Sequence, residues 1–156
     1  QGAARGGGCG LIAACDMAVA VRDATFAFTE TRLGLIPAVI SPFVIRAIDE
    51  RPARRYFLTA ETFGAAEAQR LGLVATVVDR HEDLAGESER LVTEIFKNGP
   101  HALDAAKQLI GEVTSEPELD AVLETVAERI AALRTTDEAR EGMAAFLDKR
   151  KPEWAR

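Results

Sequence analysis

The sequence predicts an α/β fold that gives way to an all-helical C-terminal region. Up to residue 78, short apolar runs alternate with segments of helical spacing, a pattern typical of parallel strands joined by helical crossovers. After residue 79 the apolar residues recur at helical spacing with no further strand pattern, which indicates amphipathic helices. The length of 156 residues and the 47% share of hydrophobic residues suit one globular domain of ordinary size.

Turn and cap residues place the elements of residues 1–78. Arg22 and Asp23 separate two apolar runs as a turn, and Ser41 followed by Pro42 offers an N-cap and a proline at the first helical position. Gly72 is expected to end a helix as its C-terminal cap. The expected elements are a strand end at 2–5, a helix over 7–15, strands over 17–21 and 24–28, helices over 41–48, 52–60 and 63–71, and a strand over 73–78.

Residues 79–156 are expected to be helical. Apolar stripes run over 84–96, 103–113 and 119–133, and a last helix ends near residue 147. Boundary signals precede the last three of these helices. Gly99-Pro100 precedes the helix over 103–113. Ser115 and Glu118 precede the helix over 119–133, and Thr135 and Glu138 precede the last helix, each pair with capping-box spacing. We expect these stripes to serve core packing and subunit packing.

Composition argues against several classes of function. The formal net charge of −6 speaks against a general nucleic-acid or anionic-membrane surface. No apolar run is long enough to span a bilayer and no cationic cleavable leader is present, so no membrane association is expected and the predicted location is cytoplasmic. His81 and His101 are the only histidines, and no metal site is predicted.

The two cysteines, Cys9 and Cys15, lie six residues apart on different faces of the helix expected over 7–15. They cannot form a disulfide there without breaking the helix, and they lack metal-ligand spacing. We expect both to be small buried thiols in a reducing compartment. Nucleotide binding is disfavoured as well, because neither G-x-G-x-x-G nor G-x-x-x-x-G-K-[ST] spacing occurs.

Three consecutive glycines, residues 6–8, open the apolar segment that ends at Asp16. Glycine costs about 1 kcal/mol per helix position relative to alanine, so a triple glycine indicates that some group approaches the backbone closely. The first turn of a helix also presents unpaired N–H groups and the positive end of the helix dipole. Together these features predict a binding place for a negatively charged oxygen. The alternative is that the glycines only let a helix pack tightly on a strand.

Glu30 is the candidate acid–base residue. It lies in a compact apolar segment, after Phe26, Phe28 and Thr29 and before the run GLIP at 34–37. A carboxylate in such surroundings is suited to proton transfer. The alternative is an exposed loop carboxylate.

These motifs follow one another in the order GGG-x-G, an apolar stretch, CD, a strand pattern, ATF-x-x-x-E and LGLIP. In that order they resemble the enoyl-CoA hydratase/isomerase (crotonase) superfamily. The similarity continues through GAAEAQRLGLV at 64–74 and reaches FLDKR at 146–150 and PEW at 152–154, so it covers essentially the whole chain. The resemblance implies a crotonase fold, a spiral of parallel strands and helices. Residues 1–78 would be the C-terminal part of its α/β core, with the N-terminal part absent, and 79–156 a helical oligomerisation region.

The resemblance also implies a mechanism. Gly7 matches the position whose N–H holds the thioester oxygen of an acyl-CoA and stabilises an enolate, with Gly6 and Thr29 beside the substrate. Glu30 matches the second of two glutamates that family hydratases use. The first would fall at Gly10, where glycine can do no acid–base work, although the position still borders the substrate. The alternatives are therefore an isomerase that uses Glu30 alone, or hydration in which a different group orients the water.

Other positions bear on the substrate. Ala38 stands in the pocket wall where many members have glycine, and the runs PAVISPFVIRAI and RRYFLTAE resemble the branch acting on branched or glutaconyl-type acyl-CoAs. A second carboxylate on the acyl group would then need a cation, for which Arg32 and Arg46 are candidates. Phe146 and Lys149 match positions that contact the adenine and phosphate end of coenzyme A, the alternative being a solvated charged tail.

The predicted function is that of an enoyl-CoA hydratase (a lyase) or isomerase of fatty-acid or branched-chain amino-acid metabolism. Coenzyme A enters as part of the substrate, and no other cofactor is expected. The resemblance implies a homotrimer or a dimer of trimers. Because the chain looks like the last three-fifths of a family member, a non-catalytic remnant is the alternative from another functional class.

Overall fold

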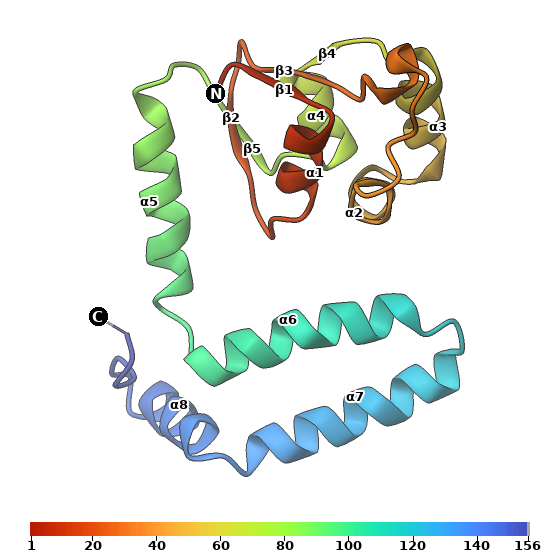
Figure 1. Cartoon of the computed structure of the whole chain (residues 1–156). Helices are drawn as coiled ribbons and strands as arrows, with labels where there is room; N and C mark the ends of the chain where they lie inside the picture. The colour runs from red at the N-terminus through yellow and green to blue at the C-terminus, as the bar shows by residue number, and fades with distance from the viewer. Residues whose placement is uncertain (156) are drawn as a thin grey trace. The chain divides into compact units, whose positions relative to one another are not determined.

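The computed structural model describes residues 1–155. The chain forms two compact units, Gln1–Glu89 and a second unit that starts at Arg90. Helix α5 (Asp83–Ile95) contains the boundary between them (Figure 1). Each unit is described below by itself.

Unit 1 carries the strands. Its elements are β1 (Ala3–Arg5), α1 (Gly7–Ala13), β2 (Val19–Val21), β3 (Thr25–Ala27), the 3-10 helix η1 (Glu30–Leu33), α2 (Ser41–Ile48), α3 (Glu50–Thr59), β4 (Phe63–Gly64), α4 (Ala65–Leu71) and β5 (Thr76–Val78). Strand β3 lies between β1, which is parallel to it, and β4, which is antiparallel, while β2 and β5 form a separate parallel pair. The predicted α/β pattern with parallel strands is confirmed.

Aromatic side chains fill the core of unit 1. The ring centroids of Tyr56 and Phe63 lie 4.3 Å apart, and Phe63 also stacks on Phe26 at 5.7 Å. Phe28 meets Phe57 edge-on at 5.0 Å. Burial of one such side chain stabilises the fold by about 1.5–3 kcal/mol, so this cluster fixes β3 and β4 against the helices.

Several boundaries differ from the sequence prediction, among them those of α1 (Gly7–Ala13 against 7–15) and β5 (Thr76–Val78 against 73–78). Ser41 is the first residue of α2 rather than its cap, because Ile40 already has helical dihedral angles and serves as N-cap; the Ser41 hydroxyl donates to Ala38 O instead. Helix α3 begins at Glu50, two residues before Pro52. The stretch predicted as one helix over 63–71 starts with strand β4, since Phe63 pairs with Phe26.

Gly72 ends α4 as predicted. Its φ of 88° lies in the left-handed region, and a Cβ at this position would lie 2.8 Å from Ala47 O. Both the backbone conformation and the close approach of α2 therefore require glycine.

Unit 2 is helical, as predicted. After the end of α5 it contains α6 (Pro100–Ser115), α7 (Leu119–Arg134) and α8 (Asp137–Leu147), with α6 and α7 running antiparallel (Figure 1). The capping predictions were wrong in detail. Ser115 is the last residue of α6, and Thr136 rather than Thr135 caps α8, its hydroxyl accepting from Ala139 N at 3.2 Å.

The apolar stripes of α5, α6 and α7 are only partly buried. None of these helices has a buried residue among those that the structure describes. Ile110 and Leu119, for example, are 67% and 68% exposed. Leu103, Leu109, Val122 and Val126 are half-buried and α6 packs on α7, so the predicted packing is present in part. In the described part of the chain, no helix combines the length and apolarity that crossing a bilayer requires.

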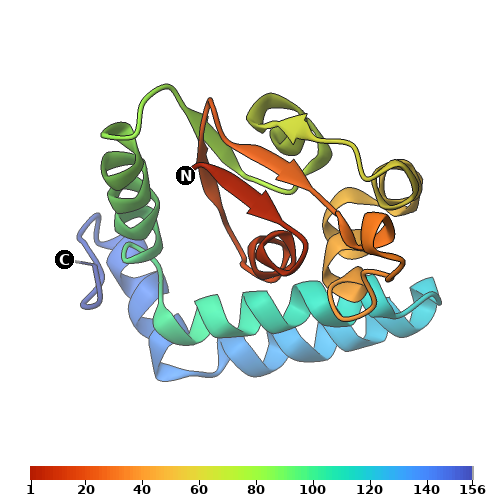
Figure 2. The same cartoon turned by 45° about the horizontal axis from the view of Figure 1, so that its top comes forward.

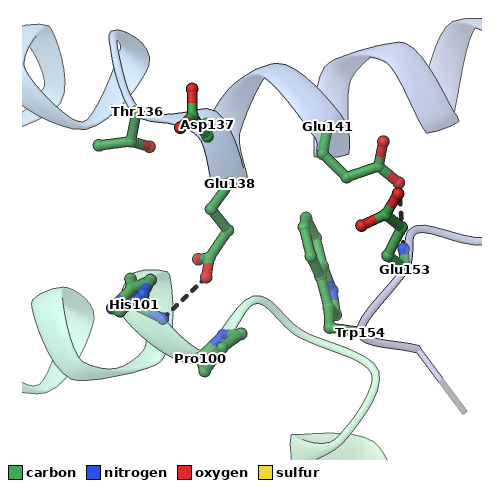
Figure 3. Close-up of a pocket in the computed structure, with 8 residues that line it drawn as sticks. All are labelled: Pro100, His101, Thr136, Asp137, Glu138, Glu141, Glu153 and Trp154. Carbon is green, nitrogen blue, oxygen red and sulfur yellow. Dashed lines mark hydrogen bonds between the residues drawn. The ribbon is translucent and has the colours of Figure 1, made fainter.

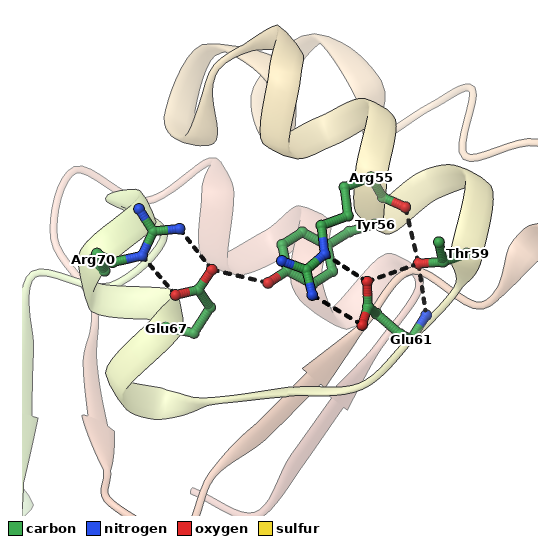
Figure 4. A network of polar contacts seen from close by, with 6 residues as sticks. All are labelled: Arg55, Tyr56, Thr59, Glu61, Glu67 and Arg70. Carbon is green, nitrogen blue, oxygen red and sulfur yellow. Dashed lines mark hydrogen bonds and ion pairs between the residues drawn. The ribbon is translucent and has the colours of Figure 1, made fainter.

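A surface network links α3 to α4. Glu67 accepts hydrogen bonds from Arg70 at 2.6 Å and from the Tyr56 hydroxyl at 2.9 Å, while Arg55 pairs with Glu61 (Figure 4). The hydrogen bond from Arg70 is the main reason that the pKa of Glu67 falls to about 2. The Tyr56 ring thus joins the aromatic core to this network.

Glu67 gives a pH prediction. Its pKa in the folded chain is about 2 against an ordinary value of 4.5, so its stabilising effect is complete above pH 4.5 and is lost as the pH falls toward 2. We expect Glu67→Gln to lower stability by no more than about 1 kcal/mol at pH 6, since water screens the exposed Arg70, and the difference from wild type to shrink at low pH. Urea unfolding of wild type and variant at several pH values measures this difference in stability. Glu89→Gln is the control, and a difference that grew on acidification would contradict the assignment.

Candidate active site

The ends of two parallel strands bring the predicted site residues together. Strand β1 leads into α1 and β3 leads toward η1, and the two strands pair with Arg5 opposite Ala27. Figure 2 shows β1 and β3 side by side, with α1 starting where β1 ends. The carboxyl ends of parallel neighbours meet at one edge of a sheet, so the start of α1 lies beside Glu30.

Gly6 makes the closest approach to the acid. It is the N-cap of α1 with a φ of 48°, and its N–H donates to Ala27 O at 3.0 Å. A Cβ on Gly6 would lie 3.0 Å from Glu30 Oε1 and 3.5 Å from Glu30 Cδ. The carboxylate therefore rests against the Gly6 backbone, and both the positive φ and this contact favour glycine.

Gly7 presents an open backbone donor. It is the first residue of α1, and a Cβ placed on it would have no atom within 4 Å. Within residues 1–155 its N–H has no hydrogen-bond acceptor. An unpaired N–H at a helix start can bind an oxygen that carries negative charge.

Glu30 has a buried oxygen with no partner. Its Oε2 is shielded from solvent and makes no hydrogen bond to any residue that the structure describes. A buried carboxylate oxygen without a partner is costly, and such atoms are found where a ligand or a reaction uses them. The alternative of an exposed loop carboxylate is therefore wrong.

Cys9 lies in the first turn of α1 and is fully buried. Burial raises the pKa of its thiol, and the nearby Glu30 charge adds to that effect. The thiol donates to Ala4 O at 3.4 Å and to Ala27 O at 3.6 Å, so it ties the helix start to both strands. Cys15 is exposed, which corrects the expectation of two buried thiols.

Gly10 is a packing position. It is buried in α1, and a Cβ on it would overlap Ile40 Cγ2 and lie 2.7 Å from Ile40 Cβ. The contact lets α1 and α2 approach closely. No side chain, and in particular no carboxylate, fits at position 10 while Ile40 stays in place.

Gly10→Ala is therefore expected to destabilise unit 1. Overpacking against Ile40 costs about 1–3 kcal/mol, which exceeds the gain of roughly 0.5–1 kcal/mol that alanine brings to a helix interior. Urea unfolding measures the change. Gly8→Ala is the matched control in the same helix, because its Cβ would meet only Ala4 Cβ at 3.9 Å. Equal stability of the two variants would disprove the tight contact.

The segment after Glu30 forms an apolar rim, which we define as residues 33–39. Its exposed members are Leu33, Leu35, Ile36 and Val39, with exposed fractions between 61% and 86%. Ala38 lies in this rim, exposed, and its N–H donates to Ile36 O at 2.8 Å. Thr29 is half-buried directly before Glu30. Sequence reasoning missed the rim, although the run LGLIPAV carried its signal.

Phe146 and Lys149 belong to unit 2. Phe146 is 82% exposed near the end of α8, and Lys149 follows in a left-handed conformation with a φ of 54°. Their contact with coenzyme A stays a prediction. The structure brings Gly6, Gly7 and Glu30 together within unit 1, with Thr29 adjacent in sequence.

A depression in unit 2 is lined by the carboxylates of Asp137, Glu138, Glu141 and Glu153 (Figure 3). Its carboxylates serve the fold. Glu138 accepts from His101 N at 3.0 Å and from Ala102 N at 2.8 Å, which caps α6, and Glu141 pairs with Arg150. Among the described residues no cluster of three or more His, Cys, Asp or Glu is suited to hold a metal ion.

Comparison with known proteins agrees with this geometry. Residues 1–156 match the family described as Enoyl-CoA hydratase/isomerase. The chain belongs to this family. It is 35% identical over 156 residues to 2,3-dehydroadipyl-CoA hydratase of Escherichia coli, covering 99% of this chain and 60% of that protein. It is 31% identical over 153 residues to mevalonyl-coenzyme A hydratase of Aspergillus fumigatus, covering 96% and 56%.

Solved structures of this family confirm the crotonase fold. An enoyl-CoA hydratase from Shewanella pealeana superposes with a TM-score of 0.93 at 41% identity, covering 99% of this chain and 57% of that one. An enoyl-CoA hydratase/isomerase from Marinobacter aquaeolei gives 0.93 at 37% identity, covering 100% and 59%. The chain spans about three-fifths of the length of the relatives it matches.

Proposed function

We propose that this site binds an acyl-CoA thioester and stabilises its enolate. The buried, unpartnered Oε2 of Glu30 beside the start of α1 carries the proposal. Glu30 supplies the acid–base group, and the Gly7 N–H supplies a donor to the thioester oxygen. One such donor contributes about 3 kcal/mol to transition-state stabilisation.

The chemistry follows from the charge that develops. Removal of a proton from the carbon next to the thioester, or addition of a nucleophile to the conjugated double bond, moves negative charge onto the thioester oxygen. The N–H of Gly7 and the positive end of the α1 dipole stabilise that charge. Glu30 is the base that takes the proton and the acid that returns it.

Two reactions use this enolate. The first is hydration of a branched or glutaconyl-type enoyl-CoA, supported by relatives that are named as hydratases. The second is isomerisation of the double bond with Glu30 alone, supported by the exclusion of any side chain at Gly10.

Loss of enoyl-thioester absorbance tests the hydration candidate, with crotonyl-CoA and 3-methylglutaconyl-CoA as substrates. Exchange of the α-proton of butyryl-CoA in D₂O tests enolate formation itself. A folded chain that shows neither would support the non-catalytic remnant. Any exchange that depends on Glu30 would rule the remnant out.

Arg32 is proposed to bind a second carboxylate on the acyl group. It follows Glu30 by two residues in η1 and is exposed, and its guanidinium has no hydrogen-bond or ion-pair partner in residues 1–155. A charge-assisted hydrogen bond of about 1.5 kcal/mol corresponds to roughly tenfold, so Arg32→Met is expected to lower the preference for 3-methylglutaconyl-CoA over crotonyl-CoA by about that factor. Arg46→Met tests the second candidate.

Arg51→Met is the matched control for this prediction, because Arg51 is an exposed arginine in α3. Unchanged preference in both the Arg32 and the Arg46 variants would reject recognition of a carboxylate by these arginines.

We also propose self-association as a homotrimer or a dimer of trimers. The exposed apolar side chains on α5, α6 and α7, such as Val92, Ile110 and Leu123, support it, since exposed apolar surface marks interaction sites. Light scattering of the purified chain measures the oligomer, and a monomer at all concentrations would contradict the proposal.

A further inference from the structure

We infer that Thr31 is a positioning residue that holds the Glu30 carboxylate at the start of α1. The inference rests on the acid–base role proposed above for Glu30. Thr31 follows Glu30 directly in η1, and its hydroxyl donates a hydrogen bond of 2.9 Å to Phe57 O in α3. Within residues 1–155, no other side chain of η1 forms a hydrogen bond to another element. The hydroxyl is therefore the polar link between the segment that carries the acid and a helix of unit 1.

The carbonyl of Phe57 depends on a donor from outside α3. It lies in the last turn of this helix, where carbonyl groups lack an N–H four residues ahead. Ala60 leaves the helix with a left-handed φ of 49°, and Glu61 N donates to the Thr59 hydroxyl at 3.3 Å instead. The Thr31 hydroxyl supplies the missing donor. Because Thr31 and Phe57 are both half-buried, this hydrogen bond is stronger than one in water.

The segment on each side of Glu30 contacts the same residue of α3. Two positions before the acid, the Phe28 ring is buried and meets the Phe57 ring edge-on, with the ring centroids 5.0 Å apart. One position after the acid, the Thr31 hydroxyl donates to the Phe57 carbonyl. The backbone of Glu30 is thus attached to α3 on both sides, which restricts the positions that the acid can take.

The carboxylate of Glu30 has no hydrogen bond of its own to hold it. It accepts none within residues 1–155, and it rests against Gly6, where a Cβ would lie 3.0 Å from Oε1. The backbone of η1 and this contact therefore determine where the carboxylate lies. A general base must come within hydrogen-bond reach of the proton that it takes. Since a displacement of about 1 Å can slow a reaction about 100-fold, release of η1 from α3 is expected to slow proton transfer.

The variant Thr31→Val tests the inference, because valine has nearly the shape of threonine but no hydroxyl. The readout is exchange of the α-proton of butyryl-CoA in D₂O at several substrate concentrations. We expect kcat for exchange to fall by about 10–100-fold and KM to stay within about threefold of wild type, since a displaced base affects the reaction more than binding. Thr31→Ser keeps the hydroxyl and is expected to have a kcat within about threefold of wild type. A wild-type kcat in Thr31→Val, or a kcat in Thr31→Ser as low as that of Thr31→Val, would overturn the inference.

The matched control for stability is Thr59→Val. The Thr59 hydroxyl also donates to a backbone carbonyl at 2.9 Å, that of Arg55 in the same helix α3 (Figure 4). We expect exchange to slow in Thr31→Val and to stay at the wild-type rate in Thr59→Val, with the stability of both variants measured by urea unfolding. Equal slowing in both would assign the loss to general destabilisation and overturn the inference.

A smaller substitution covers the case in which Thr31→Val does not fold. Thr31→Ala also lacks the hydroxyl, adds no bulk, and is expected to show the same fall in kcat. Failure of both variants to fold would assign Thr31 to folding and reject the positioning role.

Exchange in wild type and in Glu30→Gln separates this inference from the proposed function. Exchange that is lost in Glu30→Gln but unchanged in Thr31→Val would leave the enolate chemistry standing and reject the role of Thr31. Absence of exchange in the folded wild-type chain would reject the enolate chemistry and the inference with it.

Discussion

Glu30→Gln is expected to slow exchange of the α-proton of butyryl-CoA by about 10²–10⁴-fold. The amide has nearly the shape of the carboxylate but cannot accept a proton from carbon, so the base is lost while the packing against Gly6 is retained. The Oε2 atom of Glu30 is buried and unpartnered among the described residues, so no folded-state hydrogen bond is broken. Proton NMR in D₂O measures the rate.

Stability offers an independent check on Glu30. Because replacing an unpaired buried carboxylate by a neutral amide removes a desolvation cost, the variant is expected to be at least as stable as wild type. Glu50→Gln, on the exposed side of α3, is the control for exchange. Exchange that continued at the wild-type rate in Glu30→Gln would show that another group is the base.

Gly7→Pro is expected to lower the same exchange rate by about 10²–10³-fold, because it removes the backbone N–H that we propose binds the thioester oxygen. Proline is well tolerated at the first position of a helix, where the N–H has no helical partner. A side chain at position 7 also has room, since no atom lies within 4 Å of a Cβ placed there. Circular dichroism confirms that the variant is folded.

Gly7→Ala is the matched control. It adds a Cβ in the same open space and keeps the N–H, so its exchange rate should stay within a fewfold of wild type if the donor, and not the absence of a side chain, is what the site uses. Equal loss in both variants would instead mean that the open space itself is occupied by substrate. Equal activity in both would remove Gly7 from the site.

Local signals in the sequence predicted most elements of the fold. Gly72 stops α4 for the reason expected, a left-handed backbone, and Pro100 opens α6. The predicted boundaries were wrong where a contact between residues distant in the sequence determined the structure. Phe63 pairs with Phe26 and becomes a strand residue, although the local pattern is helical. The Ser41 hydroxyl turns to Ala38 O rather than capping its helix.

The candidate site was predictable in part. The glycine run at a helix start and an acid in an apolar segment are local patterns that indicated residues 6–8 and Glu30, while the choice of Gly7 came from the family resemblance. The contacts of Glu30 with Gly6 and of Ile40 with Gly10 are not local, since they join residues that lie 24 and 30 positions apart. The spacing of apolar residues in the sequence does not predict which distant side chain packs against a glycine.

The pairing of Arg5 with Ala27 has a consequence for how this site can change over evolutionary time. The distance between donor and acid is set by two neighbouring strands, and a slip of one residue would move one against the other by about 3.3 Å. The rim at 33–39 begins downstream of that pairing and is not part of it. Substitutions in the rim can therefore accumulate while the spacing between Gly7 and Glu30 is inherited unchanged.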